Sequence, residues 1–99
     1  MSNYEHTLSK HRRLAILRHL EICREYTCNA AILQDVVNEV GVTSTRDQVV
    51  TDIAWLAENG FAKHEDNGVF VVVQATKRGV EIAQGIALHP DIQRPSPKA

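Results

Sequence analysis

Apolar residues recur at helical spacing over the first quarter of the chain. Residues 8–25 contain no glycine or proline, and Ile16, Leu17, Leu20 and Cys23 fall on one face of the predicted helix. A second stripe, at strict seven-residue spacing, consists of Leu8, Ala15 and Ile22. Because one face suffices for the core of so small a domain, the second stripe indicates either a dimer seam or a surface that the C-terminal helix of the same chain covers.

Two shorter helices are predicted to follow. The first covers about residues 29–40, where apolar residues recur at i, i+1, i+4 and i+5, and Thr27 or Asn29 can cap its start. The second begins more clearly, because Ser44 and Asp47 have the spacing of a capping box. Asp47 is therefore interpreted as a structural residue of the first helical turn, where an acid also favours the helix dipole.

A hairpin and a fourth helix complete the predicted elements. The Asn-Gly step at 67–68 is typical of a type I′ turn, and residues 69–73 are strongly β-prone. Thr76 is expected to cap a helix over about residues 77–88. Residues 89–99 hold all three prolines and show no periodicity, which predicts a flexible or extended tail.

The order of these elements predicts a fold class. Helix, helix, capped helix, hairpin and helix is the order of a winged helix-turn-helix, an α+β and mostly α domain. We therefore expect residues 1–88 to form a three-helix core with a two-stranded β-hairpin wing and a C-terminal helix, followed by the Pro-containing tail at 89–99.

Composition narrows the class of protein. The chain has 99 residues with 43% hydrophobic and 23% charged, the values of one ordinary globular domain. No apolar run approaches the roughly 20 residues that span a bilayer, and no secretory signal is visible. Two cysteines are too few for a disulfide scaffold. These features favour a cytoplasmic protein without membrane association.

The charge distribution is uneven. The net charge is −1, but residues 28–60 carry one arginine against five acidic residues, and both ends of the chain are basic. Such a balance argues against strong non-specific nucleic-acid binding.

The helix at residues 45–60 is the candidate DNA-reading element. Its candidate DNA-binding residues are Ser44, Thr45, Arg46, Gln48, Thr51 and Asp52. Expected phosphate contacts come from the first helix and the hairpin, namely Lys10, Arg12, Arg13 and Lys63. Trp55 is interpreted as packing under the hairpin, with an interface anchor as the alternative.

Catalytic and metal chemistry are not expected. The sequence contains no nucleophile elbow, phosphate-binding loop or zinc-protease motif, so we expect a non-enzyme without a cofactor. Cys23 and Cys28 are spaced C-x4-C rather than the C-x2-C of common zinc sites, and His6, His11 and His19 contain no i, i+4 pair. The prediction is that neither cysteine holds zinc or an arsenical.

Several segments carry a family resemblance. The segments are His11–Leu17, Arg46–Leu56, Thr76-x-Arg78-Gly79 and Arg94-Pro95-x-Pro97. Together they resemble short proteins of Mu-like prophages that are similar to ArsR-like transcriptional regulators. The resemblance implies a phage-encoded winged-helix protein in a bacterial host, and it matches the groove-facing positions of such regulators to Thr45, Arg46, Gln48, Thr51 and Asp52.

Three functions follow as hypotheses, the third being a metal-responsive repressor, which the C-x4-C spacing of the cysteines disfavours. The first is a phage transcriptional regulator that binds double-stranded DNA as a homodimer, with its third helix in the major groove. The alternative is an adaptor that binds a phage or host protein. The acidic middle of the chain and the acidic wing residues Glu65 and Asp66 favour the alternative.

Overall fold

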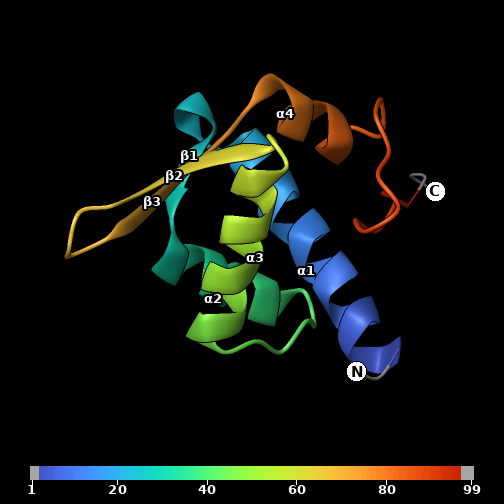
Figure 1. Ribbon diagram of the computed structural model, residues 1–99, viewed down its shortest axis with the longest axis horizontal. Helices are drawn as coiled ribbons and strands as arrows, with labels where there is room; N and C mark the ends of the chain where they lie inside the picture. The colour runs from blue at the N-terminus through green and yellow to red at the C-terminus, as the bar shows by residue number, and fades with distance from the viewer. Residues whose placement is uncertain (1–2, 97–99) are drawn as a thin grey trace.

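The computed structural model describes residues 3–96, which form four α-helices and a small antiparallel sheet (Figure 1). The helices are α1 (Asn3–Ile22), α2 (Ala30–Glu39), α3 (Arg46–Glu58) and α4 (Lys77–Ala83). The strands are β1 (Thr27–Asn29), β2 (Ala62–Asp66) and β3 (Val71–Ala75), and a 3-10 turn, η1 (Arg24–Tyr26), precedes β1. The α+β, mostly helical class expected from the sequence is confirmed.

The sheet has three strands, so the prediction of a two-stranded sheet was wrong. The order is β1-β3-β2, and both neighbouring pairs are antiparallel. The added strand is only three residues long and pairs Thr27 with Gln74 and Asn29 with Val72. A segment this short has no readable alternation, and it gains its strand conformation from pairing with β3.

The hairpin also differs in its turn. Asn67 N donates to Phe70 O at 3.0 Å, and the Asn67 side chain accepts from the amides of Val69 and Phe70. The connection is therefore a four-residue loop, with Gly68 at a left-handed φ of 88°. Phe70 belongs to this loop and not to the strand, because the Asn67 side chain holds its amide.

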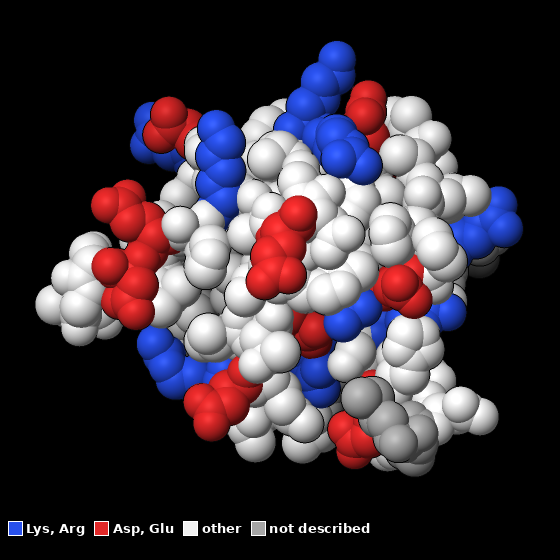
Figure 2. All heavy atoms as spheres, viewed as in Figure 1, with Lys and Arg blue, Asp and Glu red and all other residues white. Residues whose placement is uncertain are grey.

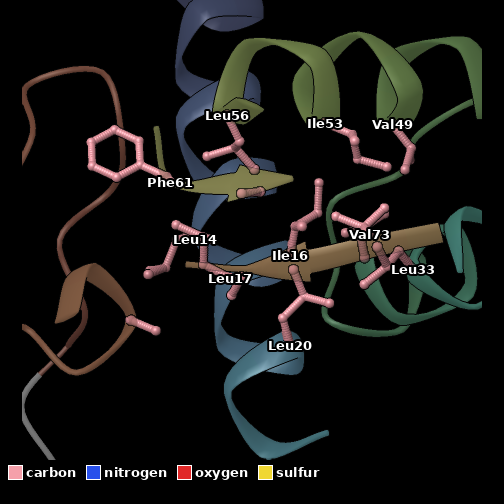
Figure 3. Packing of buried hydrophobic residues seen from close by; sticks show 14 of the residues in the cluster. Leu14, Ile16, Leu17, Leu20, Leu33, Val49, Ile53, Leu56, Phe61 and Val73 are labelled. Atoms are coloured by element: carbon pink, nitrogen blue, oxygen red, sulfur yellow. The ribbon is translucent and has the colours of Figure 1, made fainter. Parts of the chain in front are cut away.

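Helix α1 runs through the core and contacts every other helix. Ile16, Leu17 and Leu20 are fully buried on it, as the stripe predicted. Figure 3 shows these side chains pointing toward residues of α2, α3 and β3, among them Leu33, Ile53, Leu56 and Val73. The helix begins at Asn3 and not near Leu8, so an additional turn extends beyond the expected start.

The fourth helix is shorter than predicted, and its cap is confirmed. Thr76 Oγ1 accepts from Gly79 N at 3.2 Å, but the helix ends at Ala83, and Gly85 has a left-handed φ of 79°. The chain then folds back beside α1 (Figure 1), where Gln93 N donates to Lys10 O at 3.1 Å. The part of the predicted tail at 97–99 lies outside the described residues.

Candidate nucleic-acid interface and the ion-pair cluster beneath it

Helix α3 begins one residue later than expected. Thr45, not Ser44, is the N-cap: Gln48 N donates to Thr45 Oγ1 at 3.2 Å, and Thr45 N donates to Gln48 Oε1 at 2.9 Å. The capping box is thus Thr45–Gln48, because the Ser44 side chain is engaged elsewhere. The side-chain oxygen of Gln48 accepts a hydrogen bond within this box. The side-chain NH2 group is therefore the part of Gln48 that could donate to a base.

Ser44 is buried and belongs to the interior. Its hydroxyl accepts from Arg12 Nε at 2.7 Å and donates to Val42 O at 2.7 Å. The Asn38 side chain accepts from the Ser44 amide at 2.8 Å, which ties the end of α2 to the start of α3. The prediction that Ser44 contacts DNA is therefore wrong, because its side chain is buried.

Asp52 is the centre of a buried ion-pair cluster with two arginines of α1. Its Oδ2 accepts from Arg12 Nη1 at 2.7 Å, and its Oδ1 accepts from Arg13 Nε at 2.9 Å. Asp52 is 2% exposed and Arg12 is 3% exposed. Neither side chain faces solvent as the DNA hypothesis required, since each satisfies the charge of the other in the interior.

Arg13 connects this cluster to an aromatic group. Its guanidinium lies 3.9 Å from the centroid of the Trp55 ring, and its Nη1 donates to Asp91 O at 2.9 Å. Trp55 stacks on Phe61 and meets His89 edge to face. Trp55 is thus half-buried between Arg13 and the C-terminal segment, an environment that its position near the polar face of α3 did not reveal.

The exposed part of the predicted interface is smaller than expected. Thr45, Arg46 and Thr51 on α3 and Lys63 on β2 are exposed, and Lys10 is half-buried. Two of the four expected phosphate-binding side chains, those of Arg12 and Arg13, pair with Asp52 instead.

Charges on the visible face of the molecule are mixed (Figure 2). Glu65 and Asp66 are exposed on the hairpin next to Lys63, and acidic side chains are visible there at the left of the view. Beyond them the tip of the hairpin is apolar, with Val69 77% exposed and Phe70 also exposed. The hairpin therefore presents acidic and apolar groups together.

The predicted dimer seam is interrupted. Leu8 and Ala15 are half-buried and pack against the core of their own chain, in which α4 lies against α1. Ile22 is 76% exposed. Dimerisation stays a prediction, and of the three residues only Ile22 is exposed enough to contribute to it.

The two cysteines lie together at the end of α1. Cys23 and Cys28 are both half-buried and free, and His19 lies beside them. Burial, and then the neighbouring Cys23, raise the pKa of the Cys28 thiol above its ordinary value. His19 and Cys23 are four residues apart, a relation that the spacing of the histidines alone does not reveal.

The fold and site define a small α+β protein with a capped surface helix and an exposed hairpin. No helix among residues 3–96 is long and apolar enough to cross a membrane. The chain is 40% identical over 92 residues to the uncharacterized protein gp26 of Escherichia phage Mu. The aligned region covers 93% of this chain and 95% of the phage protein. It therefore belongs to the family of this Mu phage protein. No protein-family model and no solved structure matches the chain.

Proposed function

We propose that the chain is a winged-helix protein that regulates phage transcription by binding double-stranded DNA in the cytoplasm of a bacterial host. The observation that carries the proposal is the order of its elements. A helix and a short strand precede the α2–α3 pair, a β-hairpin follows, and the hairpin's β3 lies between β1 and β2. In helix-turn-helix proteins the second helix of such a pair enters the major groove.

The orientation of Asp52 supports this proposal. An acidic side chain on the groove-facing side of α3 would repel phosphates, but Asp52 points inward to Arg12 and Arg13. Arg46 is exposed in the first turn of α3, where free amide groups already favour an anion. Thr51, five residues further along the helix, is exposed as well. The reading surface is then Thr45, Arg46 and Thr51, with Lys63 on the hairpin as a phosphate contact.

The test is a binding titration against duplex DNA from the region upstream of the gene, at low and moderate salt. If Arg46 contacts a base, Arg46→Ala should weaken specific binding about 5- to 150-fold, which corresponds to about 1–3 kcal/mol. The matched control is Lys77→Ala, which removes the same charge from the exposed start of α4. The absence of saturable binding at physiological salt, with the protein folded, would refute the proposal.

A protein partner is the second candidate, and the hairpin favours it. Its exposed Val69 and Phe70 stand beside Glu65 and Asp66, a combination that suits a basic and apolar protein surface better than a phosphate backbone. Under this alternative, Phe70→Ser abolishes capture of a partner from infected-cell extract, whereas Arg46→Ala does not change the binding of duplex DNA.

A further inference from the structure

Three thiol and imidazole side chains meet where α1 ends and β1 begins. His19 lies in the last turn of α1, Cys23 directly follows the helix, and Cys28 is in β1. Each offers one ligand atom, and these atoms all lie within 4.8 Å of one another. All three side chains are half-buried, so they are accessible to an ion from solvent and are shielded on one side by the protein.

The backbone between the cysteines is pinned in a tight reversal. Tyr26 N donates to Cys23 O at 3.0 Å, and the Gln74 side chain donates to Glu25 O at 3.1 Å. Glu25 and Tyr26 have left-handed φ values of 54° and 56°, which non-glycine residues rarely adopt. This reversal returns the chain toward α1, so that Cys28 in β1 lies beside Cys23.

We propose that His19, Cys23 and Cys28 form a zinc site with two thiolates and one imidazole. Zn²⁺ prefers tetrahedral sulfur and nitrogen ligands, and bond lengths of about 2.0–2.3 Å place such ligands about 3.5–3.8 Å apart. The ligand atoms now lie within 4.8 Å of one another, so binding requires them to approach one another by up to about 1 Å. Small side-chain rotations can produce such a shift. The fourth position is left for water or for a donor from another molecule.

Location supports a structural role for this ion. The three ligands belong to α1 and β1, and β1 pairs with β3 of the hairpin at Cys28 and Val73. A bound ion would fix the end of the central helix to the sheet that carries the exposed hairpin. Such a site differs from what the C-x4-C spacing predicts, and its formation does not depend on whether the hairpin contacts DNA or protein.

The test is a titration of the reduced full-length chain with Co²⁺ and then with Zn²⁺. One equivalent of Co²⁺ should produce thiolate-to-cobalt charge-transfer absorption and the visible bands of a tetrahedral ion, and Zn²⁺ should displace both. His19→Gln, Cys23→Ser and Cys28→Ser should each weaken binding by more than about tenfold. The matched control His11→Gln removes an exposed histidine of the same helix and should bind as the wild type does.

The outcomes decide the proposal even if a cysteine variant does not fold. Wild-type protein that gives no charge-transfer band while it is reduced overturns the proposal, and no variant is needed for that result. A band that persists in His19→Gln with unchanged intensity and affinity overturns the assignment of the imidazole. Loss of two mass units with loss of both thiols in air, and no cobalt binding under reductant, would identify the pair as a disulfide-forming couple instead.

Discussion

Replacing Asp52 by asparagine tests whether the buried ion-pair cluster holds α1 against α3. The substitution keeps the size of the side chain and removes its charge. Asparagine can still accept a hydrogen bond from one guanidinium through its carbonyl oxygen, but its amide nitrogen would face the donors of the other. Arg12, at 3% exposure, would then lose the counter-charge that its buried position requires.

The expected cost is large. Removing one partner of a buried ion pair typically costs about 3–5 kcal/mol, because the remaining charge stays in the interior without compensation. A small domain has only about 5–15 kcal/mol of total stability, so Asp52→Asn should remove about a fifth of it or more. Loss of the Asp52 charge should affect Arg12 most, because Arg12 Nη2 already has no hydrogen-bond partner among the described residues.

Urea unfolding followed by far-ultraviolet circular dichroism measures this cost. The fluorescence of Trp55 gives a second probe, because Arg13 of the cluster lies over its ring. The matched control is Asp47→Asn in the exposed first turn of the same helix, which should cost only about 0.3–1 kcal/mol through the helix dipole. Equal costs for the two variants would refute the reasoning and would show that the cluster contributes little to stability.

Three further predictions concern the fold, and urea unfolding measures each of them. Ile92→Ala should cost about 2–5 kcal/mol because Ile92 is 4% exposed. The control Ile86→Ala, at 71% exposure, should change stability by less than about 0.5 kcal/mol. Equal effects of the two substitutions would mean that the C-terminal segment does not pack against the domain. Thr45→Ala should cost about 0.5–2 kcal/mol and lower helicity, and no loss would contradict its role as the cap. Gly79→Ala should cost at least about 1–3 kcal/mol, because the added methyl group would collide with Phe61 O, and a stable variant would contradict that close approach.

Periodicity and capping chemistry predicted most of the fold. The core stripe of α1, the cap Thr76 and the hairpin position follow from local residue spacing, and the structure confirms them. Of the two cap candidates for α2, Thr27 and Asn29, the structure shows Asn29 as the cap. The third strand was missed because three residues hold no pattern of their own and depend on β3, which lies more than forty positions away. Docking of the C-terminal segment was missed for the same reason: one buried isoleucine among prolines leaves no periodic signal.

The candidate interface was predicted less well because a helical pattern gives the position of a side chain but not its partner. Arg12, Arg13 and Asp52 were interpreted as surface charges, which is the usual environment of such residues. Opposite charges that lie on two packed helices can satisfy each other in the interior, and only the relative placement of α1 and α3 decides between these environments. The pairing of Asp52 with Arg12 and Arg13 changes which charges the α3 surface presents to a partner. The internal pairing removes Asp52 from the face where it would repel DNA, and it equally removes two cations that were expected to attract DNA. Arg46 is thereby left as the main cation of the α3 surface.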